Sequence, residues 1–270
     1  MKPFLSWSLA GSAALLCACA SSPGAAPEPG ASVGSGKEWI TESDEPELRR
    51  RARLRLELAA GYFEQGQTTV ALDEIKQSLA ADPSYAPAHN LRGLIYLRLK
   101  EPRVAEASFL QALKLDARDG DSWHNLGWLR CEEGRYAEAV QAFGQALQAP
   151  HYGAAAKTWM SQGICQARAG QTPEAERSLM RSFELDAANP ITGYNLASLL
   201  MQRRDYARAQ FHIRRLNNSE LANAESLWLG LRIERKLANR EAERQLGEQL
   251  RRRYPESKET AALERGAFDD

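Results

Sequence analysis

Residues 123–146, WHNLGWLRCEEGRYAEAVQAFGQA, carry the pattern that decides the fold of this chain. Small residues stand at Gly127 and Ala139, Gly134 lies between them, and the large Phe143 follows Ala139 by four residues. Apolar residues three and four apart lie on one face of a helix, and a glycine between two such stretches is typical of a helix end. The stretch therefore predicts two antiparallel helices that approach closely where their small residues face each other.

The same pattern occurs six times. The small residue that opens the second half of each block recurs at spacings of 34, 34, 36, 34 and 33 residues, at Ala71, Ala105, Ala139, Ala175, Ala209 and Ala242. A second small residue lies twelve positions earlier, at Ala59, Gly93, Gly127, Gly163, Ala197 and Gly230, and a large apolar residue lies four positions later, at Ile75, Phe109, Phe143, Leu179, Ile213 and Leu246. Three series with one period predict a solenoid of stacked helix pairs.

These blocks resemble tetratricopeptide repeats, and the resemblance covers about four fifths of the mature chain. It implies an all-α solenoid of six helix-turn-helix repeats in a right-handed superhelix, whose first helices line a concave binding surface. We expect helices from Glu47 to Arg253, a repeat domain over residues 47–256 and a flexible tail over 257–270. Residues 150–154 are expected to form a longer loop. Mid-block glycines are missing at Lys100, Arg204 and Leu237, and repeat six reads as one residue out of register.

The beginning of the chain predicts export and lipid attachment. Residues 1–18 have one basic residue and a short apolar core, as in a signal peptide, and are too short to span a bilayer. Residues 15–22, LLCACASS, resemble the lipobox of bacterial lipoproteins, with Cys19 as the lipidated first residue of the mature chain. A plain cleaved signal with an incidental Cys19 is the alternative.

The segment after Cys19 predicts a tether. Residues 20–36 consist almost entirely of Ala, Ser, Pro and Gly, a composition that does not bury enough apolar surface to fold. We therefore expect a flexible linker over residues 19–46. The lipoprotein resemblance implies sorting to the outer membrane, facing the periplasm, because Ala20 and not Asp follows the cysteine.

The charge balance of the chain bears on one class of partner. The 35 basic and 35 acidic residues balance, which argues against a nucleic-acid partner. The basic run at residues 49–55 follows four acidic residues and is interpreted as a solvated helix face, with a patch for anionic lipid as the alternative.

No motif in the sequence predicts an enzyme. The four histidines have no metal-ligand spacing, and phosphate-binding loops, nucleophile elbows and paired catalytic carboxylates are not recognisable. We expect no catalytic residue, no metal, no cofactor and no small-molecule substrate.

Cys131 and Cys165 are candidates for a disulfide, because both fall in first helices of adjacent repeats in an exported protein. Against this, equivalent positions of packed helices are about 10 Å apart, whereas a disulfide needs Cα atoms within about 7 Å. Two buried free thiols are the alternative interpretation.

The inward-facing positions of the first helices predict an apolar partner-binding groove. An apolar strip exposed on a protein surface typically marks a binding surface. Part of the set is expected to form ordinary contacts between neighbouring helices. The predicted groove residues are Leu56, Phe63, Asn90, Leu94, Leu97, His124, Asn125, Trp128, Met160, Ile164 and Tyr194.

Three stretches extend the resemblance to one family of lipoproteins. They are residues 148–170, QAPHYGAAAKTWMSQGICQARAG; residues 205–216, DYARAQFHIRRL; and residues 225–243, ESLWLGLRIERKLANREAE. With the six-repeat lipoprotein layout, they resemble the type IV pilus biogenesis and stability lipoproteins of the PilF/PilW kind, the pilotins. The resemblance implies a non-enzymatic adaptor that binds secretin subunits and promotes their outer-membrane localisation and multimerisation. A scaffold for β-barrel assembly or for cell-wall hydrolases remains the alternative.

Overall fold

The computed structural model describes residues 45–268, and this part of the chain consists of thirteen helices with no strand. The predicted signal peptide, Cys19 and all of the predicted linker except Glu45 and Pro46 lie outside the described residues. The helices are α1 Glu47–Glu64, α2 Thr68–Ala81, α3 Ala86–Arg98, α4 Pro102–Leu115, α5 Gly120–Glu132, α6 Tyr136–Gln148, α7 Ala155–Arg168, α8 Thr172–Leu185, α9 Pro190–Gln202, α10 Tyr206–Asn217, α11 Ala224–Lys236, α12 Arg240–Arg253 and α13 Lys258–Arg265.

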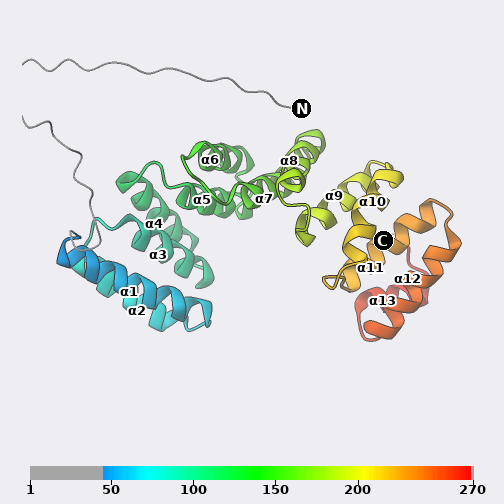
Figure 1. The fold of residues 1–270 in the computed structure, drawn as a ribbon, viewed down its shortest axis with the longest axis horizontal. Helices are drawn as coiled ribbons and strands as arrows, with labels where there is room; N and C mark the ends of the chain where they lie inside the picture. Colours follow the sequence, from blue (N-terminus) through cyan, green and yellow to red (C-terminus); the bar gives the residue numbers. More distant parts are fainter. Residues whose placement is uncertain (1–44, 269–270) are drawn as a thin grey trace, which may run out of the picture. The chain divides into compact units, whose positions relative to one another are not determined.

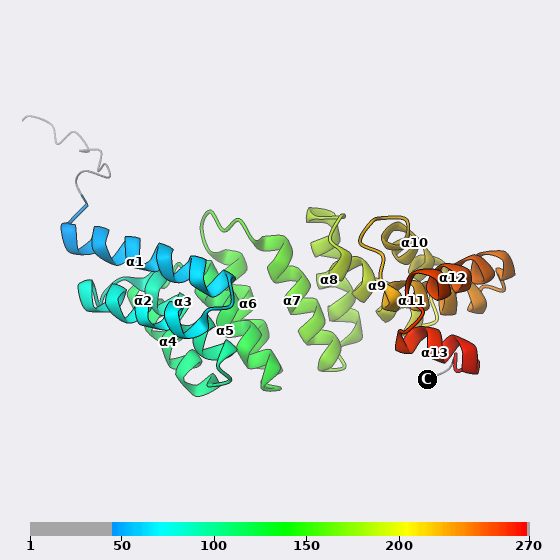
Figure 2. The ribbon, with the colours of Figure 1, turned by 90° about the horizontal axis from the view of Figure 1, so that it is seen from below.

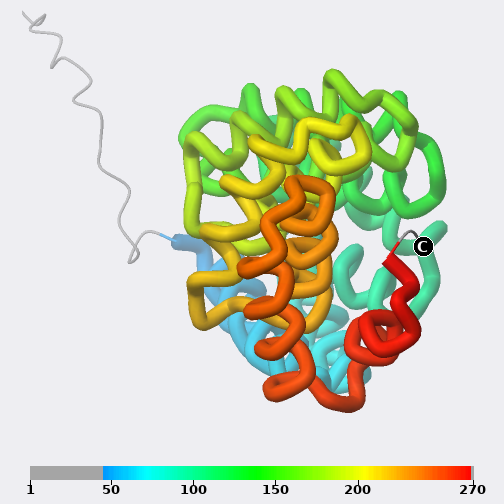
Figure 3. Tube along the Cα trace, turned by 90° about the vertical axis from the view of Figure 1, so that its right-hand side faces the viewer, coloured from blue at the N-terminus to red at the C-terminus, as the bar shows by residue number. Residues whose placement is uncertain are grey.

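Helices α1 to α12 form six hairpins, each packed against the next. Within a hairpin the first helix packs against the second, and first helices also contact the first helices of neighbouring hairpins. Figures 1 and 2 show the helices following one another in the order of the sequence, and Figure 3 shows the same succession along the Cα trace. The predicted all-α solenoid of six repeats is confirmed, and the repeats run from Glu47 to Arg253. Residues 149–154 form the longer connection between α6 and α7.

The turn inside each hairpin repeats one backbone conformation. Gly66, Gly134 and Gly170 have φ of 77°, 76° and 73°, values that glycine adopts without steric cost. Lys100 and Arg204 hold the equivalent turns with φ of 61° and 63°. Residues other than glycine are uncommon in the left-handed region. These two hairpins therefore keep the turn geometry without the glycine that usually adopts it.

Small residues on first helices make room for large residues on second helices. A Cβ atom added to Gly127 would lie 2.8 Å from Cδ1 of Phe143, and one added to Gly93 would lie 2.3 Å from Cε1 of Phe109. Both phenylalanines are fully buried. Burying such a ring contributes about 2 to 3 kcal/mol, and the glycine permits it.

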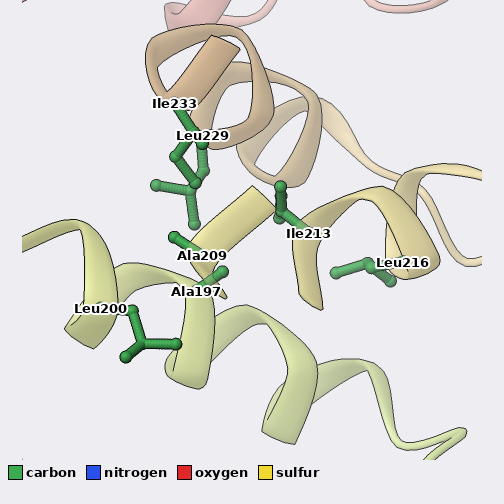
Figure 4. Packing of buried hydrophobic residues seen from close by; sticks show 7 residues of the cluster. All are labelled: Ala197, Leu200, Ala209, Ile213, Leu216, Leu229 and Ile233. Atoms are coloured by element: carbon green, nitrogen blue, oxygen red, sulfur yellow. The ribbon is translucent and has the colours of Figure 1, made fainter. Parts of the chain in front are cut away.

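Repeat five uses the same arrangement with smaller groups. Ala197 of α9 and Ile213 of α10 belong to one buried cluster that reaches α11 through Leu229 and Ile233. Figure 4 shows these side chains meeting between the three helices. The cluster therefore joins repeat five to repeat six.

The predicted register of repeat six is wrong. The turn residue with positive φ is Ala238, at 57°, and not Leu237. Ala238 lies 34 residues after Arg204, so the period is unbroken. In this register the inner contact pairs Leu231 of α11 with Gly247 of α12, both buried. Here the large residue is on the first helix and the small residue is on the second, so the combined volume of the contact is conserved. The pattern of small residues in the sequence therefore gives a register that is wrong by one position.

The predicted flexible tail is also wrong over Lys258–Arg265, which forms α13. The side chain of Ser257 accepts a hydrogen bond from the backbone N–H of Thr260, and Gly266 ends the helix with φ of 70°. Thr260 is buried and donates a hydrogen bond to the carbonyl oxygen of Tyr254. Helix α13 packs on α11 and α12 and covers the end of the array.

Candidate functional site

A groove lined by first helices is the candidate functional site. It has a volume of about 380 Å³, and each residue that lines it comes from the first helix of repeat two, three, four or five. We call it the first-helix groove; it is lined by Leu94, Leu97, His124, Asn125, Trp128, Lys157, Met160, Ser161, Ile164 and Ile191.

Helical spacing explains how one surface collects these residues. On α7, Met160 and Ser161 follow Lys157 by three and four positions, and Ile164 follows them by four and three, so the four residues share one face. Stacking of the first helices then brings that face beside the equivalent face of α5, which in turn lies beside that of α3. The result is a groove lined by apolar side chains, which we call its apolar floor, and by the polar side chains of His124, Asn125, Lys157 and Ser161.

His124 is a structural part of the groove wall. It is only 5% exposed, its Nδ1 lies 2.8 Å from Oγ1 of Thr158, and that hydroxyl lies 2.7 Å from the hydroxyl of Tyr152. Burial, with a smaller effect from the cation of Lys157, lowers the pKa of His124 to about 4. The imidazole is therefore neutral at physiological pH.

Asparagines connect adjacent repeats beside the apolar floor. The side-chain amide of Asn125 donates a hydrogen bond of 2.9 Å to Oδ1 of Asn90. Asn90 was predicted to line the groove, but its carbonyl is occupied by this contact and it is not among the lining residues.

Seven of the predicted residues lie together in the groove. They are Leu94, Leu97, His124, Asn125, Trp128, Met160 and Ile164. The other four, Leu56, Phe63, Asn90 and Tyr194, are not among the residues that line it.

Three of these four residues pack against buried clusters. Leu56 and Phe63 pack against the buried cluster between repeats one and two, and the guanidinium of Arg98 lies 3.6 Å from the centroid of the Phe63 ring. Tyr194 packs against the cluster shared by repeats five and six. Sequence periodicity places these side chains on the inner face of their helices but does not reveal which neighbours cover them.

The sequence-based list missed residues at the groove and elsewhere. Lys157, Ser161 and Ile191 complete the groove, and Ile191 is 51% exposed. Leu54 and Leu58 of α1 are each 49% exposed and line a separate, shallow surface with charged neighbours. Their spacing of four residues in an otherwise polar helix face is the sequence signal that was available.

Cys131 of α5 and Cys165 of α7 are joined in a disulfide, with Cα atoms 5.7 Å apart. The expected separation of about 10 Å applied to equivalent positions, but these are not equivalent. Cys131 follows Gly127 by four residues and Cys165 follows Gly163 by two, so the stagger along the helices brings them together. The pair lies in the same buried cluster as Phe143, with Trp128 packed against it.

The described residues contain neither a cluster of metal ligands nor a membrane-spanning helix. Over residues 45–268, no group of three or more His, Cys, Asp or Glu side chains is placed to hold a metal ion. In the same range, no helix has the length and apolar character needed to cross a membrane.

Comparison with known proteins supports the repeat assignment. Models of the tetratricopeptide repeat match residues 56–122 and 108–141. The type IV pilus assembly protein PilF of Pseudomonas aeruginosa is 28% identical over 204 residues, which cover 76% of this chain and 81% of that protein.

Solved structures agree with this relationship. The structure of Pseudomonas aeruginosa PilF matches with a TM-score of 0.74 and 26% identity, over 82% of this chain and 100% of that one. PilW, described as a widely conserved type IV pilus biogenesis factor, matches with a TM-score of 0.72 and 29% identity, over 78% of this chain and 97% of that one. This chain is therefore a tetratricopeptide-repeat protein that is homologous to PilF and shares its fold with PilF and PilW.

Proposed function

We propose that this protein is an outer-membrane lipoprotein adaptor in type IV pilus biogenesis, which binds secretin subunits and promotes their localisation and multimerisation. The single observation that carries the proposal is the first-helix groove in a chain homologous to PilF along most of its length. Trp128, Met160 and Ile164 give the groove an apolar floor suited to a segment of another polypeptide.

The proposed anchor is Cys19, which lies outside the described residues. Several acyl chains on one cysteine hold a protein on a membrane durably. A subunit bound in the groove then travels with the lipoprotein, and its raised local concentration at the membrane favours assembly of the ring. This mechanism requires binding and transport but no bond chemistry.

Replacement of Cys19 tests the anchor. We expect Cys19→Ala to leave the helical repeats folded, to mislocalise secretin and to reduce its heat-resistant multimers on immunoblots of membrane fractions. Circular dichroism of the purified variant checks the fold. Unchanged multimers in cells that carry Cys19→Ala would count against the carrier role.

Replacement of groove residues tests the binding surface. The double variant Trp128→Ala, Ile164→Ala removes two groove side chains, whereas Leu110→Ala, Leu185→Ala removes two exposed leucines from the second helices α4 and α8. We expect only the groove variant to reduce co-purification of secretin, by at least fivefold.

A third double variant separates the groove from the apolar surface on α1. Leu54→Ala, Leu58→Ala leaves the groove unchanged. If this variant, and not the groove variant, abolishes co-purification, the adaptor role survives but the groove is not its binding surface. Recovery of β-barrel assembly factors or cell-wall hydrolases in place of secretin would overturn the proposed function.

A further inference from the structure

A second pocket lies farther along the row of first helices, between α9 and α11. It has a volume of about 690 Å³, and we call it the basic pocket. Three of the residues that line it are basic and none of them is acidic: they are Ser198, Met201, Gln202, Arg204, Tyr206, Leu229, Arg232 and Lys236.

The basic pocket lies on the same repeated position as the apolar floor of the groove. Counting by the period, one position of the first helix is Leu94, Trp128 and Ile164 in repeats two, three and four. It becomes Ser198 in repeat five and Arg232 in repeat six. The inner row therefore changes from apolar to cationic toward the end of the array.

Within residues 45–268, no ion pair balances the charge of Arg232. Its Nε is buried without a hydrogen-bond partner, and within residues 45–268 no carboxylate forms an ion pair with it. The two acidic side chains of its own helix are committed elsewhere. Glu225 lies 3.5 Å from Nζ of Lys258, and Glu234 lies 2.6 Å from Nε of Arg214.

We propose that the basic pocket binds a carboxylate of an acidic residue in the same partner segment whose apolar residues occupy the first-helix groove. This inference rests on the proposed function. The planar fork of an arginine matches a carboxylate through two parallel hydrogen bonds, and Arg232 and Arg204 line one pocket.

The spacing of the two sites suits one extended segment. Ile191 lines the groove and Met201 lines the basic pocket, ten residues apart on α9. Ten residues of helix span about 15 Å, and an extended chain covers that distance in about five residues. The pocket would therefore fix the orientation of the bound segment. Its apolar residues enter the groove, and an acidic residue about five residues away enters the basic pocket.

The first test measures binding of a simple acidic probe to the purified full chain in detergent. The probe is hexaglutamate with blocked termini, and hexaglutamine is the uncharged control. Titration calorimetry measures the binding of each peptide. We expect hexaglutamate to bind weakly and hexaglutamine not to bind. Arg232→Gln should weaken hexaglutamate binding at least fivefold, and added NaCl should weaken the wild-type interaction.

A matched pair of variants controls for loss of charge and for backbone strain. Arg204 and Lys100 occupy the same turn of repeats five and two, with φ of 63° and 61°, and asparagine tolerates that conformation. Arg204→Asn should weaken hexaglutamate binding at least threefold, and Lys100→Asn should leave it unchanged. Thermal unfolding followed by circular dichroism confirms that all three variants are folded.

The outcomes separate this proposal from its alternatives. Equal binding of hexaglutamate by wild type and Arg232→Gln would overturn it. Arg232-dependent binding of phosphatidylglycerol vesicles or inorganic phosphate, without binding of hexaglutamate, would assign the pocket to phosphate groups and overturn it as well. In the last case, hexaglutamate binding depends on Arg232 but the protein does not capture secretin. This result would overturn the proposed function and leave the pocket as a site for acidic peptides.

Discussion

Repeats three and six solve the same packing problem with opposite residues. In repeat three the first helix supplies Gly127 and the second supplies Phe143, whereas in repeat six the first helix supplies Leu231 and the second supplies Gly247. In both repeats the small residue faces the large one across the hairpin. What the fold requires is therefore the combined volume of the contact and not a particular residue on a particular helix.

The surroundings of the two contacts differ for a physical reason. Phe143 lies in the middle of the array, in a cluster that also holds the Cys131–Cys165 disulfide. Gly247 lies at the end, where a Cβ added to it would be 3.4 Å from Cδ2 of Leu263 in α13. An inner repeat is held by neighbours on both sides, and the last one needs α13 as its cover.

The largest expected effect comes from removing the large residue of each contact. Phe143→Ala should lower the free energy of unfolding by about 3 to 5 kcal/mol, and Leu231→Ala by about 2 to 3 kcal/mol, because both leave a cavity in a packed interior. Urea denaturation followed by circular dichroism measures both. Leu246→Ala is the matched control, since Leu246 is the residue that the small-residue pattern assigns to this contact. A larger loss from Leu246→Ala than from Leu231→Ala would restore the sequence-based register.

A second comparison concerns the groove position that His124 holds in repeat three and Trp228 holds in repeat six. Trp228 stacks on Phe268, with ring centroids 5.5 Å apart, so the segment after α13 covers it. His124 is buried, and its Nδ1 lies within hydrogen-bond distance of Thr158 in the next repeat. Because only repeat three has a buried histidine at this position, we expect His124 to make the free energy of unfolding depend on pH.

Burial lowers the pKa of His124 in the folded state to about 4, whereas an unfolded histidine has a pKa of about 6.5. Below about pH 6.5 the unfolded state binds a proton that the folded state does not, so stability falls as the pH falls toward 4. At pH 4.5 this costs about 2 to 3 kcal/mol relative to pH 7.

His124→Gln removes this titration. The difference in unfolding free energy between pH 7 and pH 4.5 should therefore shrink by about 2 to 3 kcal/mol in the variant. His212, whose pKa burial also lowers, remains in both proteins and cancels in the comparison. An unchanged pH dependence would show that His124 is protonated in the folded protein at pH 4.5.

Sequence periodicity was sufficient for the architecture and for most of the groove. The helix limits at Glu47 and Arg253 and seven groove residues follow from residue types at a fixed spacing, because each hairpin repeats the same local contacts. Tyr194 shows the limit of this reasoning. It lies on the inner face as predicted, but packing against repeat six removes it from the groove surface.

Two predictions from the sequence are wrong: the register of repeat six and the flexible tail over Lys258–Arg265. The pattern of small residues assigns the turn to Leu237, and the repeat pattern ends at Pro255, so it assigns Lys258–Arg265 to a flexible tail. Ser257 before the last helix and Gly266 after it are ordinary cap signals. A helix of only eight residues, however, depends on packing against other helices for its stability, and cap residues do not reveal that packing. The Cys131–Cys165 contact depends on the stagger between neighbouring helices, which residue spacing within one repeat does not specify.

The smallest expected effect distinguishes the two glycines of the comparison. A Cβ at Gly127 would lie 2.8 Å from the Phe143 ring and 3.2 Å from the carbonyl oxygen of Ala139, whereas a Cβ at Gly247 would make ordinary contacts of 3.4 and 3.6 Å with leucine side chains. Gly127→Ala should therefore destabilise the protein by about 1 to 3 kcal/mol through overpacking. Gly247→Ala should stabilise it by about 0.5 to 1 kcal/mol, because alanine favours a helix and fits the space. Thermal and urea unfolding of both variants measure the signs, and a destabilising Gly247→Ala would mean that Leu231 and Leu263 leave no more room at the end of the array than Phe143 leaves in its middle.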